Sequence, residues 1–151
     1  MIDGIDKTIL RHLKEDGRIT ATALAAKVGL TVAPCHRRLR DLEQSGVIRG
    51  YRADVDPAAV GLGFEAIVFV TLRQVDRTTV AAFEAKVTES VNIVEAQRLF
   101  GTPDYLLKVM AADLPAYQRF YDDELAALPA VERLKSTLVM KNLKTNIGPP
   151  V

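Results

Sequence analysis

The sequence predicts an α+β protein, with a winged helix-turn-helix head joined to a ferredoxin-like body, and three observations predict this class. Residues 21–48 read as two helices separated by a short turn that contains glycine, and the second helix has a basic face. After residue 63 the hydrophobic pattern alternates between the strand period and the helix period. The net charge also changes sign between the two parts of the chain.

Charge and composition separate the two parts and exclude several classes of protein. Residues 1–52 carry ten Lys and Arg against six Asp and Glu, whereas residues 53–151 carry ten against thirteen. A basic module attracts polyanions, so the first part suits a DNA-binding head. No apolar run approaches the roughly 20 residues of a membrane span, and the acidic amino terminus is not typical of a secretory signal. We therefore expect a cytoplasmic protein with no membrane partner.

The chain offers little for metal or redox chemistry. Cys35 is the one cysteine, which excludes an internal disulfide and a cysteine-rich metal site, and His12 and His36 are the two histidines. Cys35 shares a helical apolar stripe with Leu39 and Leu42, which favours a small core residue over a redox switch. We expect no metal site, no catalytic residue and no cofactor.

The head begins with three predicted helices. The first extends from a cap at Asp3 to Asp16, and the second and third begin at Thr20 and Thr31, whose hydroxyls are placed to accept from free backbone N–H groups. Gly29 between the last two suits the left-handed conformation of a sharp turn. These boundaries predict a support helix followed by a helix-turn-helix.

The third helix is expected to end near Gly46, and a wing follows it. Residues 47–55 have the β-branched, aromatic and basic character of a short strand. Residues 57–63 contain two glycines and a proline and read as a linker with one helical turn. The expected domains are therefore a head over 1–56 and, after the linker, a body over 64–151.

The body reads as a split βαβ arrangement, the αβ sandwich in which four antiparallel strands carry two helices on one face. The expected elements are strand 64–72, helix 78–90, strand 93–100, strand 105–112, helix 114–128 and strand 133–143. This layout leaves one face of the sheet uncovered. Its apolar residues Ile67, Phe69 and Val139 require a partner subunit, so we predict a homodimer.

The basic face of the third helix supplies the candidate DNA contacts. Side chains near the start of a recognition helix reach base edges, and flanking arginines neutralise phosphates. The candidates are Thr31, Ala33, His36, Arg37, Arg38, Arg40, Arg18 and Arg49, with Arg37 the best placed to read a base. Alternatively, the arginines form a solvated face or pair with Asp41 and Glu43. The turn, the caps and the charge asymmetry together favour DNA.

The turn from Gly101 to Asp104 is the second informative segment. A glycine lets the backbone approach a ligand closely, Asp104 can accept from an ammonium group, and exposed N–H groups can hold a carboxylate. An amino-acid zwitterion requires these features. Spacing alone favours the alternative, a plain hairpin turn in which Gly101 supplies the backbone angle and Asp104 caps its own turn.

These segments together resemble one family. The stretches IDGIDKTILRHLKEDGR, LAAKVGLTVAPCHRRLRDLEQSGVIRGYRADVDPAAVG and GTPDYLLKV are similar to the Lrp/AsnC, or feast-or-famine, transcriptional regulators. The resemblance covers almost the whole chain. It implies a nucleoid-associated regulator that binds double-stranded DNA as a dimer, assembled into tetramers or octamers, and that responds to an amino acid.

The resemblance also implies an effector site and reverses the preference for a plain turn. In the family the effector lies between the bodies of neighbouring dimers, beside a Gly-x-x-Asp-Tyr turn. The corresponding and neighbouring residues here are Gly101, Thr102, Asp104, Tyr105, Leu106 and Thr137. We therefore expect a sequence-specific regulator whose assembly and DNA binding are modulated by an amino acid.

Two other functions would use the same architecture. An architectural DNA-organising protein without an effector needs the same head and assembly, and the sequence does not separate it from a ligand-gated regulator. Siroheme decarboxylases resemble the same two-domain architecture, but residues 53–151 contain no histidine for acid-base chemistry. We therefore expect a protein that is not an enzyme.

Overall fold

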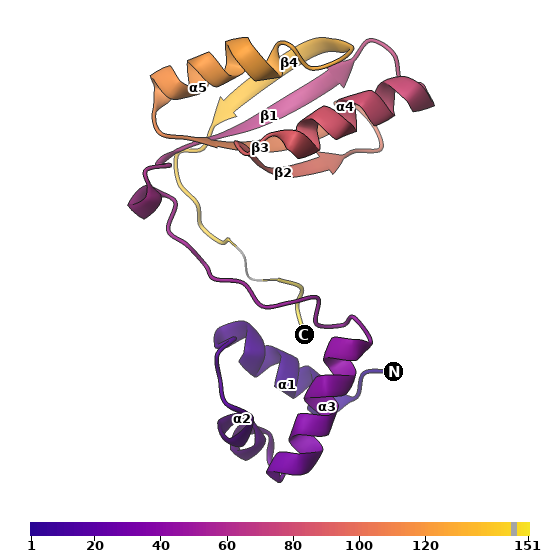
Figure 1. Cartoon of the computed structure of the whole chain (residues 1–151), viewed down its shortest axis with the longest axis vertical. Coiled ribbons are helices and arrows are strands. Elements are labelled where there is room, and N and C mark those ends of the chain that lie inside the picture. Colours follow the sequence, from indigo (N-terminus) through magenta and orange to yellow (C-terminus); the bar gives the residue numbers. More distant parts are fainter. Residues whose placement is uncertain (146–147) are drawn as a thin grey trace. The chain divides into compact units, whose positions relative to one another are not determined.

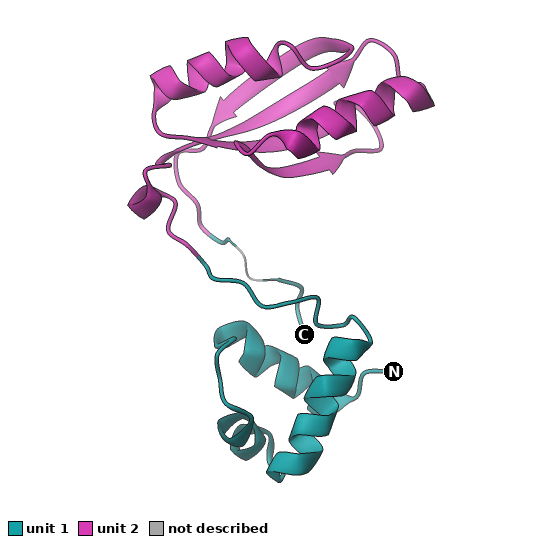
Figure 2. Cartoon of the chain, viewed as in Figure 1, with its two compact units in different colours: residues 1–54, 144–151 teal, residues 55–143 magenta. Residues whose placement is uncertain are grey.

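The computed structural model describes residues 1–145 and 148–151 and divides them into two compact units (Figure 2). The head comprises residues 1–54 and 144–151, and the body comprises residues 55–143. The chain therefore returns to the head at its carboxyl end, whereas the sequence pattern placed these last residues in the body. A contact between residues far apart in the sequence accompanies this return, because the Lys14 ammonium near the end of the first helix donates to the Pro149 carbonyl.

Three helices form the head: α1 (Gly4–Glu15), α2 (Ala21–Val28) and α3 (Val32–Gln44) (Figure 1). The predicted helix-turn-helix is thus present, and Gly29 makes its turn at a φ of 71°. Their buried residues form one small apolar core: Ile9, Leu24, Ala25, Cys35 and Leu42. The Cys35 side chain is fully buried, as predicted, and burial raises the pKa of its thiol.

Two of the three predicted helix caps are confirmed. Asp3 and Asp6 form a capping box, in which each carboxylate accepts from the other residue's backbone N–H at 2.8 and 3.0 Å. The Thr20 hydroxyl accepts from the Ala23 N–H at 3.1 Å. Thr31 occupies the N-cap position of α3, but its side chain makes no cap hydrogen bond, so that prediction is wrong. The Thr31 backbone is extended, as an N-cap requires, and the residue is exposed to solvent.

Arg38 joins α3 to the start of α1. Its guanidinium lies 2.7 Å from the Asp3 carboxylate and 2.8 Å from the Asp6 carboxylate, and Asp6 is only 9% exposed. The Asp6 backbone N–H and the Arg38 guanidinium hold the pKa of Asp3 below its ordinary value. Arg38 was expected to contact DNA. In the structure its Nη1 nitrogen donates to both carboxylates, so this side chain joins α3 to the start of α1.

The predicted wing strand is not formed by residues 47–55, all of which the structure describes. The chain leaves α3 through Gly46, at a φ of 75°, and residues 49–56 lie in no helix, turn or strand. A strand needs a neighbouring strand to accept its hydrogen bonds, and β-branched and aromatic residues alone do not supply one. Tyr51 contacts the head individually instead, and its hydroxyl donates to Glu43 at 2.8 Å.

The body is a four-stranded antiparallel sheet of order β2-β3-β1-β4 with two helices on one face (Figure 1). Its elements are β1 (Phe64–Leu72), α4 (Arg77–Glu89), β2 (Ile93–Arg98), β3 (Tyr105–Ala111), α5 (Leu114–Phe120) and β4 (Val131–Leu138). A 3₁₀ turn at Ala58–Val60 precedes them, in the predicted linker. The predicted α+β class and element order are confirmed.

Strand β1 lies at the centre of the sheet and determines which residues enter the core. Ala66, Val68, Val70 and Leu72 are buried, whereas Ile67 and Phe69 lie half-buried on the face without helices. In the antiparallel register Phe69 is opposite Leu106, and Ile67 is opposite Thr137. Since directly opposite residues point to the same side of a sheet, these residues share the uncovered face.

Three strands and one helix of the body are shorter than predicted. Strand β2 ends at Arg98 instead of residue 100, and β3 ends at Ala111 instead of residue 112. Strand β4 begins at Val131 and ends at Leu138, which is opposite Ala66. The Val139 N–H still donates to the Glu65 carbonyl at 3.0 Å, but β1 begins at Phe64, so residues 141–143 have no backbone partner on this strand.

Helix α5 ends at Phe120 and continues as a π-helical turn over Tyr121–Leu125. The helical spacing of apolar residues continues through this turn, and for this reason the sequence predicts one longer helix. Leu114, expected inward, is 56% exposed.

Replacing Arg38 with glutamine removes the cation that Asp3 and Asp6 share, so we expect a lower melting temperature than that of the wild-type protein. The effect has a defined pH dependence. Because the pKa of Asp3 is lowered from 3.8 on folding, its contribution is fully present above that pH and is lost as the pH falls through the lowered value. Circular dichroism melting over a pH series measures this difference.

The same substitution at the exposed Arg11 of α1 is the matched control and should leave the melting temperature nearly unchanged. A difference between wild type and R38Q that persists undiminished into strong acid would contradict the electrostatic account of the clamp.

Candidate DNA-binding surface and effector pocket

The exposed face of α3 carries the basic residues that the sequence pattern selected. Seven of the eight DNA candidates are exposed, and Arg38 is the exception. The exposed set is Thr31, Ala33, His36, Arg37, Arg40, Arg18 and Arg49. Within the described chain, Arg37 and Arg40 pair with neither Asp41 nor Glu43, which was one alternative reading. Their guanidinium groups thus remain directed to solvent, as a surface for a polyanion requires.

Asp104 fixes the turn between β2 and β3 to the end of β1. Its carboxylate accepts from the Leu72 N–H at 2.7 Å, and its backbone N–H donates to the Val70 carbonyl at 2.9 Å. Its own carbonyl accepts from the Leu99 N–H at 2.7 Å. The carboxylate therefore reaches the central strand instead of capping its own turn, which contradicts one part of the plain hairpin alternative. The other part, in which Gly101 supplies the backbone angle, agrees with the structure. Gly101 has a φ of 144°, which favours glycine.

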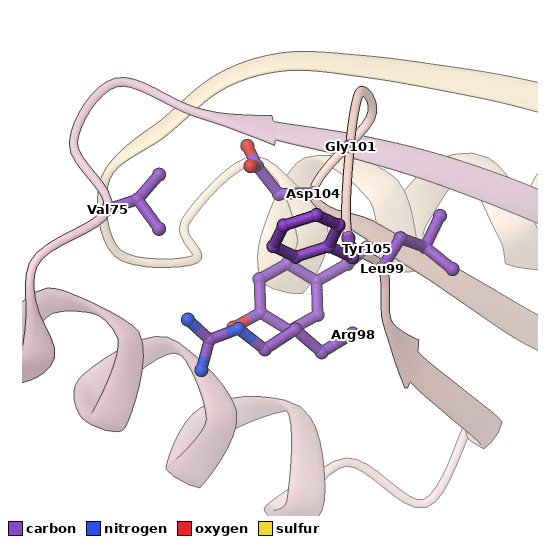
Figure 3. Close-up of a pocket in the computed structure, with 7 residues that line it drawn as sticks. Val75, Arg98, Leu99, Gly101, Asp104 and Tyr105 are labelled. Carbon is purple, nitrogen blue, oxygen red and sulfur yellow. The ribbon is translucent and has the colours of Figure 1, made fainter.

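A pocket of about 440 Å³ opens beside this turn (Figure 3). Its lining residues are Val75, Arg98, Leu99, Phe100, Gly101, Asp104 and Tyr105. Among these residues, Tyr105 packs its ring against Phe83, with 4.5 Å between the ring centroids. Its hydroxyl donates to Glu84 on α4 at 2.8 Å. Burial and the Glu84 carboxylate raise the pKa of Tyr105 to about 12, so the phenol stays a neutral donor at neutral pH.

The structure separates the six predicted effector residues into two groups. Gly101, Asp104 and Tyr105 line the pocket, and Thr102 is exposed within the same turn. Leu106 and Thr137 lie on the uncovered face of the sheet, because successive strand residues point to opposite faces. Within one chain these two residues do not belong to this pocket.

The pocket also contains residues that the sequence pattern did not select. Leu99 and Phe100 directly precede the turn, so proximity in sequence was an available signal. Arg98 is opposite Tyr105 in the β2–β3 register, and the strand period places both on the same side of the sheet. Val75 comes from the β1–α4 connection, and no local pattern joins it to the turn.

The described residues, 1–145 and 148–151, contain no group of three His, Cys, Asp or Glu side chains that could hold a metal ion. No helix in the same residues has both the length and the apolar character needed to cross a membrane. The candidate sites are therefore the basic surface of α3 and the pocket beside the Asp104 turn.

A helix-turn-helix head with an exposed basic helix, joined to an αβ body with a small-molecule pocket, defines a two-domain DNA-binding regulator. Comparison with known families agrees. Residues 2–49 match the winged helix-turn-helix DNA-binding model, and residues 65–149 match the Lrp/AsnC ligand binding domain. The chain belongs to the Lrp/AsnC family of transcriptional regulators.

Individual relatives match the chain over nearly its full length. The leucine-responsive regulatory protein of Rhizobium meliloti is 38% identical over 95% of this chain and 92% of its own length. The Bkd operon transcriptional regulator of Pseudomonas aeruginosa is 35% identical over 99% of this chain and 98% of its own. A transcriptional regulator from Neisseria meningitidis, solved as a complex with L-Met, superposes with a TM-score of 0.91 at 34% identity, covering 96% of this chain and 94% of that one.

Proposed function

We propose that the protein binds double-stranded DNA as a homodimer or a higher assembly of dimers, and that an amino acid in the Asp104 pocket modulates this binding. We also propose that the protein acts on the nucleoid, in the cytoplasm. The observation that carries it is the pocket itself, built on a turn that the Asp104 carboxylate ties to β1. The Neisseria neighbour with bound L-Met supports the choice of ligand class.

The exposed face of α3 is the proposed recognition surface. Arg37 and Arg40 would enter the major groove with the short side chain of Ala33 and with His36, and Arg37 would read a base edge. Arg18 and Arg49, which lie before and after the helix-turn-helix, would meet phosphates, and Thr31 would donate from the start of α3. Paired heads would then contact half-sites about one helical turn apart, or a multiple of it.

The uncovered face of the sheet supports the proposed assembly. Ile67, Phe69 and Leu106 expose apolar surface beside an ion pair between Lys108 and Glu65 at 3.2 Å. A second copy would remove this surface from water, at roughly 25 cal/mol per Å² buried. Leu106 and Thr137 share this face, so they would contribute to effector binding only through contacts between copies.

Replacing Arg37 with alanine is expected to weaken binding to a specific operator by about 1–3 kcal/mol if the guanidinium reads a base. If Arg37 contacts only phosphate, binding to all sequences should fall evenly and the salt dependence should become shallower. Mobility-shift titrations on a fragment of the protein's own promoter region and on unrelated DNA, at several salt concentrations, distinguish the two. Arg11→Ala, on the exposed surface of α1, is the control, and no loss by R37A on any DNA would contradict both forms.

An effective amino acid should alter DNA binding and stabilise the protein. A ligand at a hundred times its dissociation constant stabilises the state it binds by about 2.7 kcal/mol. We therefore expect one or more of the common amino acids to raise the melting temperature and to change the mobility-shift pattern. Specific DNA binding that is indifferent to every amino acid would support the architectural alternative instead.

Replacing Phe69 with lysine places a charge in the middle of the uncovered face, and we expect it to convert the dimer into monomers. Sedimentation velocity at micromolar concentration measures the change. Leu114→Lys, at a site 56% exposed on α5, introduces the same charge outside this face and should leave the dimer intact. Dimers that persist in F69K but not in L114K would place the interface elsewhere.

A further inference from the structure

The pocket beside the Asp104 turn contains an arginine that the family pattern did not select. Arg98 is the last residue of β2 and lies opposite Tyr105 in the register with β3. Figure 3 shows its guanidinium beside the Tyr105 ring, on the side of the pocket nearest α4. Its side chain is 56% exposed, so water reaches it now and a ligand can replace that water.

The charge of Arg98 is only weakly compensated. Its guanidinium lies 3.9 Å from the Glu84 carboxylate, near the outer limit for an ion pair. The same Glu84 oxygen is closer to the Tyr105 hydroxyl, which donates to it at 2.8 Å. A guanidinium presents five N–H donors in a planar fork that matches a carboxylate, so Arg98 retains donors for a second anion.

Two charges of opposite sign lie in the pocket lining. Arg98 supplies the positive charge and Asp104 the negative one, while the other lining residues are uncharged. This balance matches a ligand that carries one ammonium and one carboxylate. We propose that Arg98 binds the carboxylate of the effector and restricts it to neutral α-amino acids with an apolar side chain. This inference rests on the proposed amino-acid effector and identifies its class.

The apolar walls of the pocket account for the side chain. Val75, Leu99, Phe100 and Tyr105 supply most of the remaining lining. Phe100 is fully exposed and Val75 is 55% exposed in one chain, so an apolar ligand would cover surface that otherwise faces water. An acidic or basic effector would add a charge that the lining does not pair, and an unpaired charge among apolar groups is costly.

Isothermal titration calorimetry on the full-length protein tests this assignment. The probes are L-methionine, L-leucine, L-glutamate, L-lysine and 3-(methylthio)propylamine, which is methionine without its carboxylate. The variants are R98Q, R98K and, as a control that removes the same charge on exposed α5, R119Q. Melting curves and DNA binding without ligand verify that each variant is folded.

R119Q should bind L-methionine and L-leucine as tightly as the wild-type protein does. Both proteins should bind L-glutamate, L-lysine and the amine at least tenfold more weakly than the two apolar amino acids. R98Q should lose about 10- to 100-fold in affinity, as expected for removing a hydrogen bond to a charged group, and R98K should retain part of it.

Equal binding of L-methionine by wild type and R98Q would overturn the role of Arg98 while leaving the amino-acid effector in place. Preferential binding of glutamate or lysine by wild type would overturn the effector class. If no common amino acid binds to wild type, the proposed function itself fails, and the assignment of Arg98 fails with it.

Discussion

The pairing of β1 on both edges is the constraint on which the body depends. β3 and β4 bond to its two sides, so its alternate residues must face either the helices or the uncovered side. The carboxyl end of the same strand supplies the Val70 carbonyl and the Leu72 N–H that hold Asp104. One strand therefore sets the core, the uncovered apolar face and the position of the Asp104 turn. A change that shifts its register would disturb all three, because a slip by one residue exchanges the faces.

In the head, one helix does two tasks with adjacent arginines. Residues 37 and 38 lie about 100° apart on α3, so one guanidinium points to solvent and the other toward the start of α1. The inward one binds Asp3 and Asp6, which also form the capping box that begins α1. The apolar core of the head has five buried residues in the described chain, with eight partly buried apolar side chains packed against them. The ion pairs of Arg38 add a fixed donor geometry to this packing and so help to orient α3.

Local signals predicted the regular elements and failed where a partner was decisive. The bounds of β1 and the caps of α1 and α2 follow from short-range periodicity and side-chain chemistry, and the structure has them as predicted. Residues 47–55 have strand composition but no strand beside them. The helical phase of Arg38 places it near the edge of the buried stripe of α3, and only the fold shows that two carboxylates reach it. In the pocket, the turn could be predicted from the sequence. Val75 could not, because it comes from a loop distant in sequence, and Arg98 enters the lining through the pairing of β2 with β3.

Coupling between the effector and DNA has to be a difference in free energy between assemblies, because a ligand shifts an equilibrium only by binding one state better than another. In one chain the pocket leaves Val75 and Phe100 exposed. If a neighbouring copy covers these walls in one assembly and not in another, a bound apolar amino acid favours the first. Reciprocity then requires that DNA which gathers copies into that assembly raises the affinity for the amino acid by the same factor. The exposed walls of the pocket, more than its charged groups, would thus carry the regulatory signal.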